Sequence, residues 1–301
     1  MPKVAGVYPP IPTPFSHTSS LDEEGLQHNL SLWNRFPFAG YVVLGSNGES
    51  VHLEEQEKLR LIEQVRKNAP ADRQVIAGTG LFSTDQTIEL SRRAADVGAD
   101  GVLVLPPFYF RGQMSDNALR THFESVAEAS PVPIIIYNMP ANTGLDLSAD
   151  LVVALSSHPN IAGIKDSSGS IAKLAEIRRR CEPGFAILAG SAGFLLPALA
   201  VGAHGGVLAL ANIAPKTCLA IYRCAQEGRW EEARVLQLRI SRANRAVTRQ
   251  WGVPALKQAM DLLGLIGGPP RRPLQPLDPK TAQTLQAILT EAGIQPMKEA
   301  E

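Results

Sequence analysis

Residues 134–137 (IIIY) and 161–164 (IAGI) are two of a series of short apolar runs that decide the fold of this chain. Each is only a few residues long and is followed by polar residues, which is typical of a strand that is buried on both faces. Further runs of this kind lie at residues 41–44 (YVVL), 75–77 (VIA), 102–105 (VLVL), 185–188 (FAIL) and 207–210 (VLAL). With residues 4–11 as a first strand, eight strands are expected.

Amphipathic stretches separate these runs and predict helices, for example at residues 53–68, 84–97, 116–129 and 171–181. Strands that alternate with helices are parallel, because a helical crossover returns the chain to the same end of the sheet. A doubly wound open sheet is the main rival. The count of eight strands favours a (β/α)8 TIM barrel of the α/β class. The open sheet is also disfavoured by the segment AGTGLFST at residues 77–84, because it has only two glycines of a dinucleotide fingerprint.

The strand pattern stops after Asn212, whereas helical periodicity continues at residues 217–227, 230–248, 254–263 and 279–292. We therefore expect two parts. Residues 1–214 form the barrel, which carries the active site, and residues 215–301 form a C-terminal helical extension packed on the barrel.

Composition limits the partners of the protein. The 301 residues include 29 Lys+Arg and 29 Asp+Glu, so the formal net charge is zero and no basic field attracts nucleic acid or an anionic membrane. No apolar stretch is long enough to span a bilayer, and the first residues lack the pattern of a secretory signal, which predicts a cytoplasmic protein. The three cysteines and six histidines show no ligand spacing, so we predict no metal.

Functional residues of such a barrel lie at the carboxyl ends of the strands. Lys165 ends one run and Tyr137 ends the preceding one, so both side chains are expected at the same mouth. Desolvation among apolar walls makes a lysine amine a usable nucleophile toward a carbonyl, and a phenol beside it can move protons. Alternatively, Lys165 pairs with Asp166 or reaches solvent, and Tyr137 is a core aromatic. The presence of both residues at one mouth is stronger evidence for catalysis than either residue alone.

The segment 45–49 (GSNGE) follows another run and offers backbone N–H groups, a hydroxyl and an amide that suit a small carboxylate, although a plain turn is an equally good interpretation.

Three motifs, GSNGES at 45–50, YNMPANTG at 137–144 and GIKDSSG at 163–169, resemble in that order the dihydrodipicolinate synthase and N-acetylneuraminate lyase family. The resemblance implies a Schiff-base pyruvate aldolase or lyase that needs no cofactor and that is a homotetramer, built as a dimer of dimers. It makes Lys165 the imine-forming residue and Tyr137 the proton shuttle. Ser46 would link this tyrosine to Tyr109 of a neighbouring subunit.

The resemblance also assigns substrate contacts, which it places at Ser46, Asn47, Gly48, Asn142, Ser167 and Leu208. Ser46 and Asn47 would hold the carboxylate of pyruvate. Asn142 stands where synthases of the family carry an arginine that grips the carboxylate of aspartate semialdehyde. Feedback inhibition by lysine is not expected, because the surface at which lysine acts on synthases of the family is poorly matched by Glu55, Lys58, Phe82 and Phe108.

The segments PANTGLDL at 140–147 and AVTRQWGVPALKQAMDLLG at 246–264 are similar to 4-hydroxy-2-oxoglutarate aldolase. The resemblance therefore implies cleavage of 4-hydroxy-2-oxoglutarate to pyruvate and glyoxylate. Three alternatives stay open: a dihydrodipicolinate synthase, which condenses pyruvate with aspartate semialdehyde; a lyase or dehydratase for a longer sugar-derived 2-oxo acid; and a catalytically silent barrel that binds a 2-oxo acid.

Overall fold

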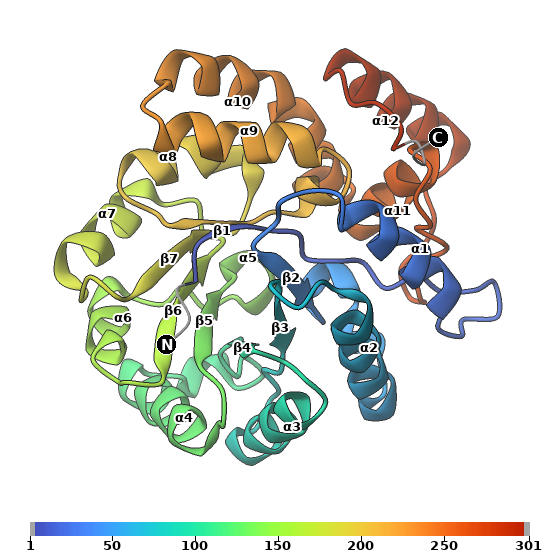
Figure 1. Ribbon diagram of the computed structural model, residues 1–301. Helices are drawn as coiled ribbons and strands as arrows, with labels where there is room; N and C mark the ends of the chain where they lie inside the picture. Colours follow the sequence, from blue (N-terminus) through green and yellow to red (C-terminus); the bar gives the residue numbers. More distant parts are fainter. Residues whose placement is uncertain (1–3, 298–301) are drawn as a thin grey trace.

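Eight parallel strands form a ring in the computed structural model, which describes residues 4–297 (Figure 1). The strands are β1 Gly6–Tyr8, β2 Gly40–Val43, β3 Gln74–Gly78, β4 Gly101–Val104, β5 Ile134–Asn138, β6 Ile161–Asp166, β7 Ala186–Ala189 and β8 Gly205–Val207. From β2 to β8 each strand pairs with the next one in the chain, and β1 pairs with β8. Bonds from Ala39 N–H to Val7 O (3.0 Å) and from Val42 N–H to Pro9 O (3.1 Å) close the ring. The predicted (β/α)8 barrel is confirmed.

The last strand lies two residues earlier than its apolar run predicts, because the run 207–210 contains the end of β8 and the start of a 3₁₀ turn at Ala209–Asn212. The strand begins with glycine for a steric reason. A Cβ on Gly205 would lie 1.9 Å from Gly6 O, and Gly205 has φ of +152°. Only glycine permits this close approach of β8 to β1. Because strands were predicted from runs of apolar residues, the two glycines at the start of β8 were not predicted as strand.

Helices separate the successive strands along the chain and one more follows β8; most of them cover the outside of the ring. They are α1 Glu23–Trp33, α2 Glu55–Asn68, α3 Thr84–Asp96, α4 Asp116–Ala129, α5 Pro140–Thr143, α6 Ala149–Ser156, α7 Ile171–Arg180, α8 Leu195–Ala200 and α9 Pro215–Gln226. Four of them begin after a serine whose hydroxyl accepts a backbone N–H of the first turn; these N-caps are Ser83, Ser115, Ser148 and Ser170. Such caps fix where each crossover helix starts.

Three further helices follow: α10 Trp230–Arg245, α11 Gly252–Leu262 and α12 Pro279–Glu291. A π-helical turn, Ala246–Gln250, joins α10 to α11. In Figure 1 the helices α9 to α12, coloured orange to red, lie together on one side of the ring, and α11 approaches α1. The amide of Asn29 on α1 donates to Ile266 O (2.7 Å), which ties the segment after α11 to the barrel. The first three residues of the predicted barrel part, 1–3, and the last four residues of the predicted extension, 298–301, lie outside the described residues.

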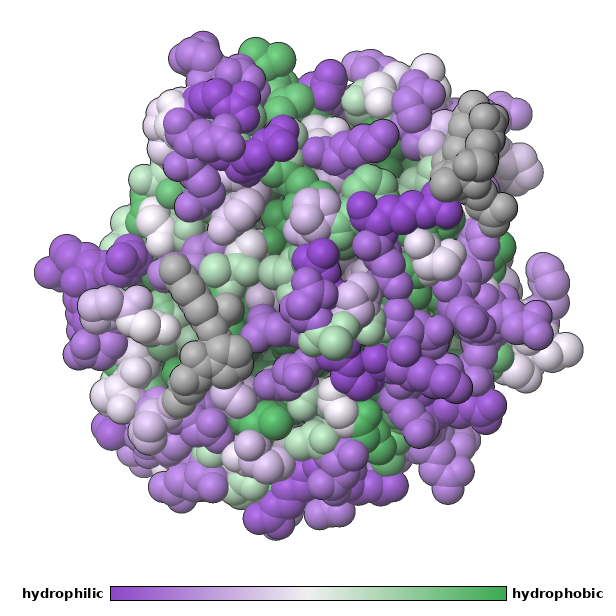
Figure 2. Space-filling view, viewed as in Figure 1, coloured by the Kyte–Doolittle hydropathy of each residue, from purple (hydrophilic) through white to green (hydrophobic). Residues whose placement is uncertain are grey.

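Two apolar layers stabilise the barrel. One fills its interior with residues such as Tyr8, Val42, Ile76, Leu103 and Ile135, and a larger one lies between the strands and the helices. The face in Figure 2 is mostly hydrophilic, with apolar residues in small areas between polar ones. Within residues 4–297 no helix is both long and apolar enough to cross a membrane.

Candidate active site

Tyr137 and Lys165 meet at the carboxyl ends of two adjacent strands. They are register partners on β5 and β6, so their side chains point to the same side of the sheet. The Lys165 Nζ atom lies 3.6 Å from the centroid of the Tyr137 ring, and each residue is only 4% exposed. A buried amine beside a phenol is an arrangement that can form a covalent bond to a carbonyl and move a proton next to it.

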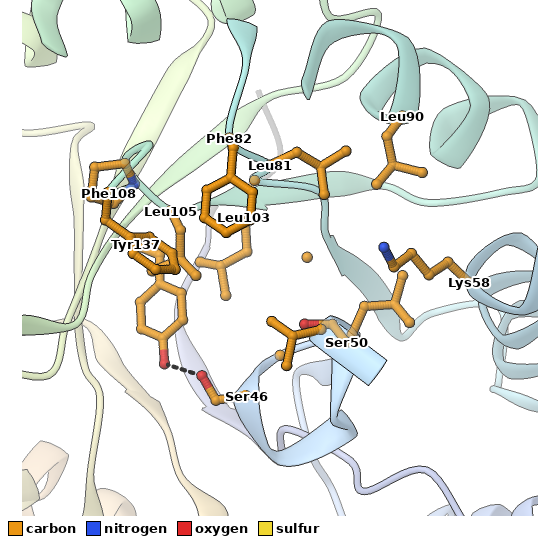
Figure 3. A pocket seen from close by; sticks show the side chains of 16 residues that line it. Ser46, Ser50, Lys58, Leu81, Phe82, Leu90, Leu103, Leu105, Phe108 and Tyr137 are labelled. Carbon is orange, nitrogen blue, oxygen red and sulfur yellow. Dashed lines mark hydrogen bonds between the residues drawn. The ribbon is translucent and has the colours of Figure 1, made fainter. Parts of the chain in front are cut away.

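Ser46 joins this pair from the opposite side of the barrel mouth. It begins a short 3₁₀ turn, Ser46–Gly48, directly after β2, and its Oγ lies 3.3 Å from the Tyr137 hydroxyl oxygen (Figure 3). The Thr13 hydroxyl donates to Gly48 O (2.7 Å) and anchors the turn to the segment after β1. The phenol is therefore held between the amine of Lys165 and the hydroxyl of Ser46.

The surroundings of Tyr137 favour its ionised form. Burial alone would raise the pKa of the phenol, but the Lys165 ammonium and the nearby hydroxyl groups of Ser46 and Ser167 together bring this pKa below its ordinary value. Gly190 leaves room for Ser167, because a Cβ at Gly190 would lie 2.0 Å from Ser167 Oγ. A phenol with a lowered pKa is ionised to a larger extent near neutral pH, and the phenolate can accept a proton.

Asp166, the residue after Lys165, holds the ends of β5 and β6 together, a role that the sequence did not predict. Its carboxylate is fully buried and accepts hydrogen bonds from the Asn138 amide (2.7 Å) and from Ser168 N–H (2.9 Å). Lys173 of α7 is its ion-pair partner at 3.1 Å. Because Asn138 follows Tyr137 and Asp166 follows Lys165, this network fixes the two strand ends against each other.

A cavity of about 260 Å³ adjoins Tyr137 and Ser46. Its walls are mainly apolar and come from β2, β3, β4 and the loops that follow them; Figure 3 shows Leu81, Phe82, Leu103, Leu105 and Phe108 among them. The Lys58 side chain of α2 extends toward the cavity, and burial lowers the pKa of its amine. The phenol thus borders a space of small-molecule size.

The other predicted residues lie around this centre at different depths. Asn47 is half-buried and Gly48 is buried in the turn with Ser46, while Leu208 is fully buried directly after β8. Asn142 is exposed on the short helix α5 that follows β5. Tyr109 is 73% exposed and contacts the rings of Phe82 and Phe110 instead of Tyr137.

The structure therefore brings together Lys165, Tyr137, Ser46 and Ser167, and within one chain it leaves Tyr109 on the surface. Among residues 4–297 no group of three or more His, Cys, Asp or Glu is placed to hold a metal ion.

Known proteins resemble the chain along almost its full length. The model of the dihydrodipicolinate synthetase family matches residues 3–292. A 4-hydroxy-tetrahydrodipicolinate synthase of Methanosphaerula palustris is 38% identical over 288 residues, which cover 95% of this chain and 98% of the relative. A probable mitochondrial 4-hydroxy-2-oxoglutarate aldolase of Emericella nidulans is 39% identical over 297 residues, which cover 97% and 96%.

Solved structures of the same family have the same fold as this chain. The dihydrodipicolinate synthase DapA-2 of Bacillus anthracis superposes with a TM-score of 0.92 at 30% identity and covers 96% of this chain and 99% of that one. The dihydrodipicolinate synthase of Aquifex aeolicus gives the same score and identity, with coverage of 98% and 100%. Fold, motif order and full-length similarity therefore lead to one conclusion: the chain belongs to the dihydrodipicolinate synthetase family.

Proposed function

We propose that the protein is a lyase that forms a Schiff base between Lys165 and a 2-oxo acid, and that it cleaves 4-hydroxy-2-oxoglutarate to pyruvate and glyoxylate. The observation that carries this proposal is the position of the buried Lys165 amine, which lies 3.6 Å from the ring centroid of Tyr137. The Tyr137 hydroxyl in turn lies 3.3 Å from Ser46 Oγ. An electrophilic carbonyl at this amine would have a proton acceptor beside it.

The proposed reaction begins when the Lys165 amine attacks the C2 ketone. Loss of water gives a protonated imine, which is an electron sink for the bond between C3 and C4. Tyr137 takes the proton of the C4 hydroxyl as this bond breaks and glyoxylate leaves. Protonation of the enamine at C3 and hydrolysis of the imine then release pyruvate and the free amine. No metal or organic cofactor takes part.

The turn Ser46–Gly48 is our candidate for the site of the substrate's first carboxylate. Its Ser46 hydroxyl lies beside the Tyr137 hydroxyl and borders the cavity, and Asn47 is the next residue of the same turn. Asn142 and Ser167 are proposed to contact the part of the substrate beyond C3. Gly48 and Leu208, both buried, are proposed as further substrate contacts.

A second candidate reaction is the condensation of pyruvate with aspartate semialdehyde. The names of several relatives favour it, because these similar curated proteins are named 4-hydroxy-tetrahydrodipicolinate synthase. The site residues favour the aldolase, because Asn142 offers an amide where a synthase is expected to offer a guanidinium to the second carboxylate. The Emericella nidulans relative supports the aldolase at 39% identity.

One experiment tests both the chemistry and the substrate. The protein is treated with borohydride in the presence of pyruvate and, separately, of 4-hydroxy-2-oxoglutarate; its intact mass is measured, the adduct is located by peptide mapping, and free glyoxylate is assayed. We expect an adduct on Lys165 in both samples and glyoxylate only in the second.

The other outcomes separate the alternatives. An adduct with pyruvate but no glyoxylate would reject the aldolase reaction, and turnover of pyruvate with aspartate semialdehyde would then identify the synthase. If neither assay shows turnover, longer sugar-derived 2-oxo acids are the remaining substrates. Pyruvate binding without any adduct would reject Schiff-base chemistry and indicate a silent barrel.

A further inference from the structure

Glu49 adopts an unusual backbone conformation directly beside the turn that carries Ser46. Its φ and ψ are +53° and +36°, in the left-handed region that residues other than glycine rarely occupy. Such a conformation persists only where surrounding contacts hold it. Its side chain is 1% exposed, so those contacts lie inside the protein.

The contacts of the Glu49 carboxylate come mainly from the segment beyond α10. Lys257 of α11 places its Nζ 2.6 Å from Oε1, and the Lys257 side chain is also only 1% exposed. Arg271 N–H donates to Oε2 (2.9 Å), and His52 Nδ1 lies 3.3 Å from the same oxygen. A buried carboxylate with one ammonium partner depends on that partner, because an unpaired charge in the interior is strongly unfavourable.

Lys257 is itself fixed in place. Its Nζ donates to Pro269 O (3.0 Å) and lies 4.3 Å from the centroid of the Phe15 ring. The Arg271 guanidinium lies 4.2 Å from the same ring and pairs with Glu57 of α2. A Cβ on Gly267 would lie 2.1 Å from Lys257 O, so the chain after α11 packs directly against this part of the helix.

The backbone of Glu49 transmits this restraint to the catalytic turn. Glu49 N–H donates to Ser46 O (3.2 Å), and Gly48 N–H donates to Gly45 O (3.0 Å). Ser46 then places its hydroxyl 3.3 Å from the Tyr137 hydroxyl. A continuous path of contacts therefore leads from Lys257 through Glu49 and Ser46 to the phenol.

We infer that Lys257 is a positioning residue: its buried ion pair with Glu49 holds the turn Ser46–Gly48 so that the Ser46 hydroxyl stays within hydrogen-bonding distance of Tyr137. This inference rests on the proposed function, since it concerns the proton shuttle of that reaction. The inference also means that the C-terminal extension affects the reaction indirectly, because Lys257 positions Ser46 but does not contact the substrate.

The test is a double-mutant cycle between Lys257→Met and Ser46→Ala, measured on the full chain with 4-hydroxy-2-oxoglutarate. Lys257→Met should lower kcat by about tenfold or more, as expected for residues coupled through one network. In the Ser46→Ala background, the same substitution should change kcat by less than about twofold, because the hydroxyl that it positions is already absent. Lys280→Met, an exposed lysine of α12, is the matched control and should leave kcat unchanged.

A second variant keeps the test informative if Lys257→Met does not fold. The pair Glu49→Gln/Lys257→Met removes both charges and leaves no uncompensated buried ion. It should retain the wild-type thermal midpoint more closely than Lys257→Met. It should still form the borohydride adduct with pyruvate, and its kcat should fall as in the single variant.

Different outcomes overturn different statements. Equal losses of kcat from Lys257→Met in the wild-type and Ser46→Ala backgrounds would show that Lys257 supports only the fold, and they would overturn the positioning role. A wild-type protein that forms no adduct with pyruvate would overturn the proposed function, and the positioning role with it.

Discussion

The Lys165 amine lies against the face of the Tyr137 ring, 3.6 Å from its centroid, because the two residues are register partners on β5 and β6. This contact has two consequences. The ammonium lowers the pKa of the phenol, and any imine formed on Lys165 is placed next to a group that can take a proton. Because strand pairing fixes the distance, no loop has to close to bring the two groups together.

Removal of the Lys165 amine should abolish the reaction. Lys165→Ala is expected to show no glyoxylate release from 4-hydroxy-2-oxoglutarate and no borohydride-stable adduct with pyruvate, because the nucleophile is absent. Continuous glyoxylate detection and intact mass measure the two effects. Substantial residual cleavage by this variant would contradict the mechanism. Lys280→Ala, at an exposed position of α12, should behave as the wild type.

Removal of the Tyr137 hydroxyl should separate the two halves of the mechanism. Tyr137→Phe keeps the ring against Lys165, so the pyruvate adduct should still form, while kcat should fall by about 10²–10⁴, the usual contribution of a positioned general acid or base. An unchanged kcat would remove Tyr137 from the proton path. Because its pKa is lowered, the wild-type activity should show an ionisation below the ordinary phenol pKa of about 10.

An arginine at position 142 should shift the balance between the two candidate reactions. Asn142→Arg offers a bidentate partner to a second carboxylate, and if the synthase site is otherwise intact, condensation of pyruvate with aspartate semialdehyde should rise relative to the wild type. Initial rates of both reactions measure the ratio. Asn142→Ala is the control, which should not raise the condensation. A wild type that already condenses these substrates efficiently would refute the argument from Asn142.

From the resemblance to the family and the exposure of Tyr109, we predict that a second copy of the chain contacts this surface. Tyr109, Phe110 and Phe82 are 73%, 65% and 58% exposed, and their rings contact one another. Tyr109→Ser should weaken the oligomer in sedimentation velocity and lower kcat in parallel. Val235→Ser, an exposed apolar position on α10, is the matched control. Full activity in a proven monomer would contradict a role of Tyr109 in a neighbouring site.

His122 should make the protein less stable in mild acid. Burial lowers its pKa to about 4 in the folded state, whereas the unfolded value is about 6.5. Between these values the unfolded chain binds the proton and the folded one does not, so stability falls as pH decreases from about 6.5 to about 4, by about 3 kcal/mol in total. Urea titrations of His122→Gln should show a flatter profile, and those of His17→Gln should follow the wild type.

The central pair of the site could be predicted from the sequence because it depends on strand order and position alone. Lys165 ends one apolar run and Tyr137 ends the preceding one, and parallel neighbours must bring such residues to one mouth. Ser46 could be expected at the same mouth, but its distance to the phenol depends on the 3₁₀ turn that follows β2.

The partners of Glu49 could not be predicted, because Lys257 lies more than 200 residues away and packing alone joins them. One signal was present: Lys257 occupies a buried position of α11 among Ala255, Leu256 and Met260, where an apolar residue is usual. The start of β8 was missed for a related reason, since the close approach of Gly205 to Gly6 is a property of the closed ring.

The pairing of β1 with β8 also governs how the protein is made. Residues Gly6–Tyr8 pair in register with Gly205–Val207, so about two thirds of the chain must leave the ribosome before the ring can close. Until then the edge of β1 that will face β8 and the last edge of the growing sheet are open, and contacts of such high sequence separation form slowly. Newly made chains should therefore depend on protection from edge-to-edge aggregation until residue 207 has left the ribosome.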